Sequence, residues 1–263
     1  MAPNPGGVLD RPGEPPDVTV RYGPAADHLV DIHLPHVTAP APVLVLLHGG
    51  FWRQGYDRRH TRPMAQALRA RGWLVATPEF RRTGGAGGWP QTFDDVAAVR
   101  AGLWSLLADV LPGRADLGRL VVAGHSAGGH LALWWALTGD PATLVRAVGL
   151  APVADLARAH ADELGGAAVA ALMGGSPAEL PDRYAAADPA AMLRRVASAD
   201  PLKYVVVHGD LDAQVPVAHS RDLPGVTLIE LRGVEHFGLI DPLSSAWPAV
   251  LAAIEGSVGV PQR

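Results

Sequence analysis

The stretch Gly124-His125-Ser126-Ala127-Gly128 stands between two segments of different character. The apolar run 120–123 (Leu-Val-Val-Ala) precedes it, and the run 129–137 after it is amphipathic and helical in pattern. A short β-rich run, a G-x-S-x-G turn and a helical run are typical of a nucleophile elbow, which leaves its serine exposed at a sharp turn. Glycines suit both ends of this turn because its backbones pass close together and Cβ atoms would clash. An ordinary turn is the alternative, so the remaining catalytic parts must be found elsewhere in the chain.

Length and composition favour one large α/β domain. The chain has 263 residues, 48% of them hydrophobic, and a formal net charge of −4. This size supports a substantial core. The slightly negative net charge argues against nucleic-acid binding, which needs a basic surface. No run of Lys and Arg predicts a basic patch that would bind a membrane surface. Cys is absent, which excludes disulfides, thiolate zinc sites and a Cys nucleophile.

The N-terminal part of the chain is rich in Pro and Gly as far as Pro16. It lacks the basic and apolar segments of a signal peptide, so we expect a flexible leader over 1–16 and a single domain over 17–263. The most apolar stretch, 120–137, contains a cluster of Gly, His and Ser that a membrane span would not tolerate well. We therefore expect a cytoplasmic protein without a membrane or nucleic-acid partner, and the sequence is compatible with a homodimer.

Eight apolar or alternating runs predict strands. Two alternating runs predict half-exposed antiparallel strands joined by a turn at Gly23-Pro24, and six further runs predict more buried strands. The eight runs are 18–22, 28–34, 43–47, 73–77, 120–123, 145–150, 203–207 and 226–231. The helical patterns between and after them lie at 58–71, at about 92–111 with Thr92 or Asp94 as the cap, at 129–137 and at about 243–254.

This alternation predicts a mostly parallel eight-stranded sheet with helices on both faces. The Ala-rich segment 155–199 breaks the pattern, and it is punctuated by Gly and Pro. We interpret it as a small cap-like insertion after the sixth strand. A glycine-rich loop at 84–88 lacks the G-K-[ST] sequence of a phosphate loop, and it predicts a mobile loop near the site.

A catalytic serine needs a base that takes its proton and an acid that holds the base in the useful tautomer. Asp210 and Asp212 directly follow the predicted strand 203–207, at the sheet edge where the elbow also ends. We favour Asp212 because it lies in the body of the loop, three residues before Val215. Asp210 fits a turn in which its side chain binds backbone amides. The alternative is that both residues only form the turn.

The candidate base is His236, in the loop after the last predicted strand. It is the only histidine after a strand and beyond Asp212. His219 is the alternative, but it lies in a predicted helix start just after Pro216. Ser126, Asp212 and His236 then follow one another in one of the known triad orders.

The oxyanion that forms during acyl transfer needs fixed N–H donors. We assign one to the backbone amide of Ala127, at the start of the elbow helix. The amides of Gly50 and Phe51 are the others, in the loop after the predicted strand 43–47, where glycine lets the backbone turn its N–H groups inward. We expect His48 to shape this loop by hydrogen bonding and to take no part in proton transfer.

The segments His48-Gly49-Gly50-Phe51-Trp52 and 124–130 together resemble the α/β-hydrolase superfamily. Within it, the chain resembles the kynurenine formamidase (arylformamidase) and small-carboxylesterase branch related to hormone-sensitive lipase. The H-G-G-x-W form is the formamidase-like variant, and the D-x-x-V-P segment at Asp212 and the G-x-x-H-F segment around His236 also match the superfamily. The resemblance covers residues 18–256 and implies the α/β-hydrolase fold, no metal and no organic cofactor.

We therefore expect a serine hydrolase that cleaves a small carboxylic ester or an aryl formamide through an acyl-enzyme intermediate. The resemblance implies N-formylkynurenine as the specific substrate. Aromatic residues on loops beside the site, Trp52, Trp89 and Phe237, are candidate substrate contacts, with plain loop anchors as the alternative. No His pair has a metal-ligand spacing supported by a carboxylate, so we expect no metal.

Two other functions fit the same fold. A dipeptidyl-peptidase-like serine peptidase uses the same triad, but its usual β-propeller domain is not in this sequence. A non-catalytic ligand-binding member of the fold usually lacks a triad residue, whereas all three candidates are present here.

Overall fold

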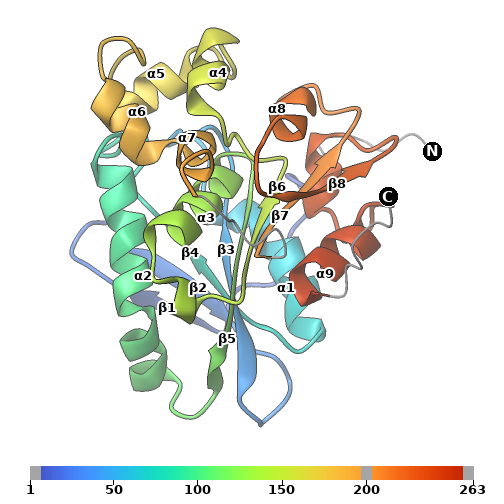
Figure 1. Cartoon of the computed structure of the whole chain (residues 1–263). Coiled ribbons are helices and arrows are strands. Elements are labelled where there is room, and N and C mark those ends of the chain that lie inside the picture. Colours follow the sequence, from blue (N-terminus) through green and yellow to red (C-terminus); the bar gives the residue numbers. More distant parts are fainter. Residues whose placement is uncertain (1–6, 197–202, 257–263) are drawn as a thin grey trace.

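A sheet of eight strands forms the centre of the structure, a computed structural model that describes residues 7–196 and 203–256 (Figure 1). The spatial order is β1-β2-β4-β3-β5-β6-β7-β8. The strands are β1 (Val18–Arg21), β2 (Leu29–His33), β3 (Ala41–Leu47), β4 (Leu74–Pro78), β5 (Ala115–His125), β6 (Arg146–Leu150), β7 (Tyr204–Gly209) and β8 (Thr227–Leu231). The pairs β1–β2 and β2–β4 are antiparallel and the others are parallel. The predicted mostly parallel, eight-stranded sheet is therefore confirmed.

The parallel direction of β3 to β8 brings functional loops to one edge of the sheet. Loops that follow β3, β5, β7 and β8 all leave from the carboxyl ends of their strands. In open α/β sheets this edge is where ligands bind. The H-G-G-F-W loop, the elbow serine and the candidate acid and base therefore converge there, although more than a hundred residues separate some of them in sequence.

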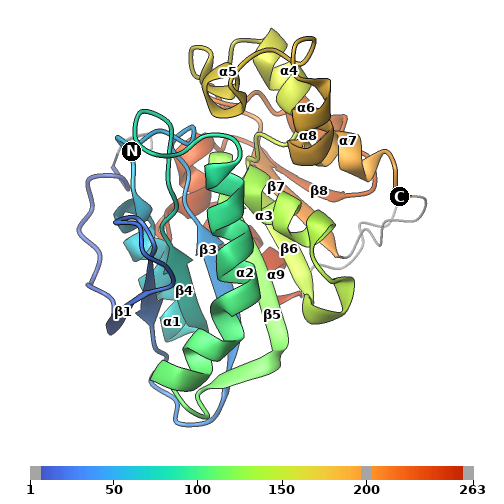
Figure 2. The same ribbon diagram turned by 90° about the vertical axis from the view of Figure 1, so that its left-hand side faces the viewer.

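Helices cover both faces of the sheet (Figure 2). Alternate residues of β3 point to opposite faces, so Val43, Val45 and Leu47 belong to one core and Leu44 and Leu46 to the other. The first core lies under α2 (Gln91–Val110) and α3 (Ala127–Thr138). The second lies under α1 (Arg62–Ala70) and α9 (Trp247–Glu255). Short helices complete the chain: η1 (Arg58–Thr61), η2 (Pro141–Thr143), α8 (Ala218–Arg221) and η3 (His236–Ile240).

The predicted insertion after the sixth strand is present as four short helices above the sheet edge (Figure 1). They are α4 (Leu156–Ala161), α5 (Ala168–Met173), α6 (Pro181–Ala187) and α7 (Pro189–Leu193). The elbow helix α3 fastens this layer, because His130 Nε2 lies 2.9 Å from the carbonyl of Ala187 and Trp134 Nε1 donates to Ala186. Residues 197–199 of the predicted insertion lie outside the described residues.

Helix α2 begins differently from the prediction. It starts at Gln91 after Pro90, and neither Thr92 nor Asp94 caps it. The Thr92 hydroxyl donates to the carbonyl of Arg81 at 2.7 Å and accepts from the amide of Gly88 at 3.0 Å. Thr92 therefore fastens the glycine-rich loop to the helix, because a hydroxyl inside the first turn is within reach of that loop.

The N-terminal segment also differs from the predicted leader. Residues 1–6 lie outside the described residues, but the chain from Gly7 onward lies against the domain. Val8 is 2% exposed and belongs to the core under α1. Arg11 forms an ion pair with Asp241. The apolar pair Val8-Leu9 supplies the anchor that the Pro- and Gly-rich composition concealed.

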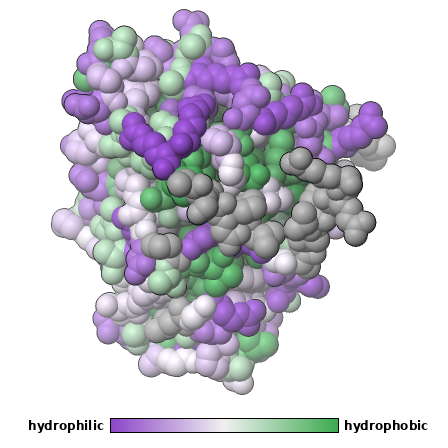
Figure 3. All heavy atoms as spheres, in the orientation of Figure 1, coloured by the Kyte–Doolittle hydropathy of each residue, from purple (hydrophilic) through white to green (hydrophobic). Residues whose placement is uncertain are grey.

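The surface in Figure 3 mixes hydrophilic and hydrophobic side chains across the face that it shows. Within the described part of the chain, no helix has the length and apolarity needed to cross a bilayer.

Candidate active site

The strand-to-helix turn at Ser126 has the backbone of a nucleophile elbow. β5 ends at His125 and α3 begins at Ala127, so Ser126 alone joins them, with φ 55° and ψ −117°. A non-glycine residue held in such a conformation costs on the order of 1–3 kcal/mol, which the surrounding packing must offset. A Cβ on Gly124 would lie 2.1 Å from the carbonyl oxygen of Gly128. Glycine is therefore required where strand and helix pass close together at Ser126, which is itself 2% exposed.

The candidate base and acid are directly bonded. His236 Nδ1 lies 2.6 Å from Asp212 Oδ2, and the other carboxylate oxygen accepts the amides of Gln214 and Val215, each at 2.8 Å. Burial would raise the pKa of Asp212, but the hydrogen bonds from His208 and His236 outweigh it and hold the pKa well below its usual range. Asp212 is therefore ionised and accepts the Nδ1 proton, which leaves Nε2 of His236 as the proton acceptor.

Asp210 and His219, the alternatives for the acid and the base, make other contacts. Asp210 Oδ1 accepts the amide of Gly233 at 2.6 Å, which is the turn role predicted for it. His219 Nε2 lies 2.9 Å from Asp162 Oδ2 of the loop after α4. Neither side chain bonds the Asp212–His236 pair.

Ser126 and His236 line one cavity of about 80 Å³ at the sheet edge. No hydrogen bond joins Ser126 Oγ to a described side chain, so the serine–histidine contact is open. Catalytic hydrogen bonds of this kind often tighten only when substrate binds. The full lining is Leu9, Gly50, Phe51, Tyr56, His60, His125, Ser126, Gln214, His236 and Phe237.

His125 holds the segment that carries His236. Its Nε2 donates to the backbone carbonyl of His236 at 3.0 Å, and the two ring centroids lie 4.4 Å apart. Burial, with a further contribution from His236, lowers the pKa of His125 well below its usual value. His125 is therefore a neutral packing residue.

The loop after β3 offers the predicted oxyanion donors. Gly50 has φ +105°, and a Cβ there would lie 2.4 Å from the Cβ of Tyr56. Phe51 is also left-handed, with φ 50°. Among the residues that the structure describes, no acceptor takes the amide protons of Gly50, Phe51 or Ala127. Their N–H groups are thus available to an oxyanion formed above Ser126.

A buried carboxylate supports this loop from below. Glu79, the residue that follows β4, bonds His48 Nε2 at 2.7 Å, Arg82 Nη1 at 3.1 Å and the amide of Arg58 at 3.1 Å. His48 Nδ1 in turn lies 2.8 Å from the carbonyl of Gly49. Burial would raise the pKa of Glu79, but His48 and the other partners lower it to about 2. His48 therefore shapes the oxyanion loop by hydrogen bonding, as predicted.

Of the three aromatic residues predicted to contact substrate, one lines the cavity and two do not. Phe237 lines the cavity, but Trp52 is 1% exposed and packs edge-on against His130, with ring centroids 5.2 Å apart. Trp89 packs against Phe93 and is not among the lining residues. The structure therefore places Trp52 in the core, because two successive left-handed residues turn its side chain under the loop.

His208, the penultimate residue of β7, is a contributor that the sequence pattern did not single out. Its Nε2 lies 3.2 Å from Asp212 Oδ2 and 2.8 Å from the carbonyl of Val215, and its Nδ1 lies 2.7 Å from Ser220 Oγ. Its place at the end of a strand, four residues before Asp212, was the available signal. Leu9, Tyr56 and His60 in the cavity wall were also missed, and for Leu9 no sequence signal exists.

Within the described residues, no group of three His, Cys, Asp or Glu side chains is arranged to hold a metal ion. The arrangement supports proton transfer between a serine, a histidine and a carboxylate.

The sheet order, the elbow and the bonded acid and base define an α/β-hydrolase. The BD-FAE family matches residues 30–225, and the chain belongs to this family. Two proteins of Mycobacterium tuberculosis (strain ATCC 25618 / H37Rv) are similar in sequence. The probable carboxylic ester hydrolase LipM is 32% identical over 130 residues, and esterase LipC is 33% identical over 125 residues. These regions are 48% and 46% of this chain but only 29% and 30% of the relatives.

Among solved structures, esterase B from Lactobacillus rhamnosis (HN001) superposes with a TM-score of 0.69 at 18% sequence identity, over 94% of this chain and 86% of that one. This likeness shows the fold. The predicted superfamily is therefore confirmed, while the names of these relatives point to esterases and not to arylformamidases.

Proposed function

We propose that this protein is a carboxylic ester hydrolase that acts through Ser126, His236 and Asp212. The observation that carries the proposal is the 2.6 Å bond between His236 and Asp212 at the cavity that Ser126 also lines. The similarity to LipM and LipC supports ester hydrolysis as the reaction.

The chemistry follows from the positions of these groups. Ser126 Oγ attacks the carbonyl carbon while His236 Nε2 takes its proton, and Asp212 stabilises the imidazolium that forms. The amides of Gly50, Phe51 and Ala127 bind the oxyanion. His236 then donates the proton to the leaving alcohol, which departs and leaves an acyl-serine. Water attacks the acyl group with His236 again as the base, and this step releases the acid and regenerates Ser126.

The size of the cavity supports a small substrate group at the serine. About 80 Å³ is lined by apolar and aromatic side chains, including Phe51, Tyr56 and Phe237. Such a wall suits a short acyl group or an aryl group. An aryl formamide, with N-formylkynurenine as the candidate, would use the same triad, and it is the second substrate that the H-G-G-F-W loop suggests.

Ser126→Ala should lower ester turnover by a factor of at least ~10⁴ without unfolding the protein, because it removes only the nucleophilic oxygen. The measurement is the initial rate on p-nitrophenyl acetate, with circular dichroism as the folding control. A fluorophosphonate probe should label the wild-type protein at Ser126 and leave the variant unlabelled. An unlabelled wild-type protein would rule out the enzyme and favour the ligand-binding alternative.

A hydrolysis panel separates the substrate classes. It sets short and medium p-nitrophenyl esters against N-formylkynurenine and a dipeptide p-nitroanilide, and we expect kcat/KM to be highest on the short esters. Preferential cleavage of N-formylkynurenine would establish the formamidase instead, and cleavage of the dipeptide would establish the peptidase. A cytoplasmic location and a homodimer stay predictions.

A further inference from the structure

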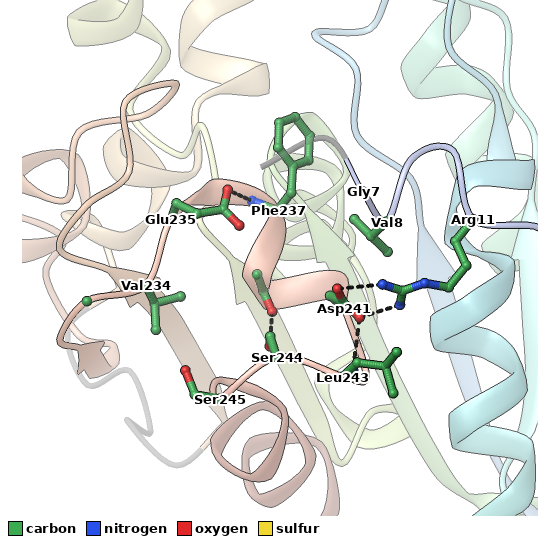
Figure 4. A pocket seen from close by; sticks show the side chains of 12 residues that line it. Gly7, Val8, Arg11, Val234, Glu235, Phe237, Asp241, Leu243, Ser244 and Ser245 are labelled. Atoms are coloured by element: carbon green, nitrogen blue, oxygen red, sulfur yellow. Dashed lines mark hydrogen bonds and ion pairs between the residues drawn. The ribbon is translucent and has the colours of Figure 1, made fainter. Parts of the chain in front are cut away.

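The N-terminal segment contributes one side chain to the active-site cavity. Leu9 lines this cavity together with Ser126 and His236, although it lies more than a hundred residues away from both in sequence. Its neighbour Val8 is buried in the core under α1 and anchors the segment from the other side. Figure 4 shows Val8 beside Phe237 at a pocket that both residues line.

An ion pair holds the segment to the element that carries the base. Arg11 Nη1 and Nη2 donate to the two carboxylate oxygens of Asp241 at 2.5 Å and 3.0 Å (Figure 4). Asp241 directly follows η3, whose first residue is His236. The bond from Arg11 holds the pKa of Asp241 below its usual range, so the carboxylate is charged at neutral pH. Both side chains are partly exposed, at 32% and 20%, so salt can screen the pair.

Leu9 is one of three residues that lie between the small cavity and a much larger groove. The groove, of about 640 Å³, runs between the N-terminal segment and the residues from Gln54 to Arg62. Leu9, Tyr56 and His60 line both the cavity and the groove. Shortening Leu9 would therefore join the two spaces, whereas the other shared residues belong to the loop after β3 and to η1.

We propose that Leu9 is a specificity-determining residue that closes the substrate cavity and limits the length of the group bound there. The Arg11–Asp241 pair holds Leu9 in this position. This inference rests on the proposed ester hydrolase and names its substrate class: esters whose group in the cavity is short.

Leu9→Ala should extend the range of substrates toward longer chains. We expect kcat/KM on p-nitrophenyl octanoate, relative to the acetate, to rise about tenfold, since a methylene or two in an apolar pocket changes discrimination by roughly this factor. A parallel series of alkyl acetates tests the alcohol side, and a tenfold shift in either series supports the proposal. The matched control is Leu243→Ala, which removes the same atoms from a leucine that is 79% exposed and outside the active-site cavity.

Arg11→Met should shift the profile in the same direction, because it releases the segment without shortening Leu9. Raising the salt concentration from 0.05 M to 1 M should likewise relax the preference of the wild-type protein but not that of Arg11→Met. Arg221→Met is the control, because it breaks the surface pair with Glu230, away from the cavity. Unchanged length profiles in both Leu9→Ala and Arg11→Met would overturn the inference.

The rate of labelling by fluorophosphonates of increasing alkyl length reports the same limit without requiring turnover. If the wild-type protein is labelled but hydrolyses no ester, the proposed reaction fails while the length profile still tests Leu9. If esters are hydrolysed and neither variant changes the profile, only the role of Leu9 fails.

Discussion

Asp212 carries the densest set of contacts at the site. Its two oxygens accept from the rings of His236 and His208 and from the amides of Gln214 and Val215. A carboxylate that accepts this many hydrogen bonds keeps its charge, because each bond favours the ionised form. Three neighbours besides His236 therefore hold the charge and orientation of the Asp212 carboxylate: His208, Gln214 and Val215.

Asp212→Asn should reduce kcat by about 10³–10⁴-fold. The asparagine amide can donate a hydrogen bond to Nδ1 of His236, which favours the tautomer with its proton on Nε2, and that tautomer cannot take the proton of Ser126. The paired variant is Asp210→Asn, which changes a carboxylate that only accepts the amide of Gly233. We expect that variant to keep kcat within about threefold of the wild type, as a surface turn contact contributes little. Steady-state kinetics on a short ester compare the two, and the reverse ranking would mean that the acid was wrongly assigned.

The triad could be predicted from the sequence, whereas the cavity wall could be predicted only in part, through Gly50, Phe51 and Phe237. Ser126, Asp212 and His236 each follow a strand, and parallel strands end at one edge, so position along the chain determined position in space. Trp52 was misplaced because the direction of a loop side chain depends on local φ values that the sequence does not reveal. Leu9 was missed because it approaches the site from a segment without a periodic pattern.

At the scale of elements, the strand cores were predicted well and their ends less well. β5 was expected over 120–123 but begins at Ala115, where its first residues pair with Ala41 and Pro42 of β3 across an irregular register. Polar residues and Gly118 interrupt the apolar pattern there, so pairing with a neighbour decided the strand and periodicity did not. The end of β5 at the elbow was predicted because Gly124 and Gly128 indicate a sharp turn there.

The junction of β5 and α3 has no room for a side chain at Gly124. Gly124→Ala should therefore separate strand from helix, lowering the free energy of unfolding by about 2–4 kcal/mol and displacing Ser126. The matched substitution is Gly102→Ala in α2, where an added Cβ meets nothing within 4 Å. That change should stabilise the protein by about 0.5–1 kcal/mol and leave activity intact. Urea unfolding and ester turnover measure both; equal effects of the two alanines would contradict the packing argument.

At the scale of the whole molecule, the stability of the fold depends on a histidine that the active site does not use. His33, at the end of β2, is completely buried, and neither ring nitrogen has a partner in the described structure. Burial lowers its pKa to about 4, although nearby Asp31 opposes the shift. An unfolded chain restores the ordinary value of about 6.5. Because the folded state binds the proton more weakly, stability is full above pH 6.5 and falls as the pH drops toward 4.

His33→Leu should flatten this dependence. The wild-type protein should lose about 3 kcal/mol from this group between pH 6.5 and pH 4, because each unit of pKa difference is worth about 1.4 kcal/mol. The leucine variant should lack that part of the slope, whereas His36→Leu, which changes an exposed histidine of the same segment, should retain it. Urea unfolding at pH 4, 5, 6 and 7 measures the three proteins side by side. Parallel curves for the wild type and His33→Leu would show that the buried ring is protonated in the folded state or reached by water. Since His33 is not among the residues that line the active-site cavity, the slope of unfolding should change while the pH profile of kcat stays as it is.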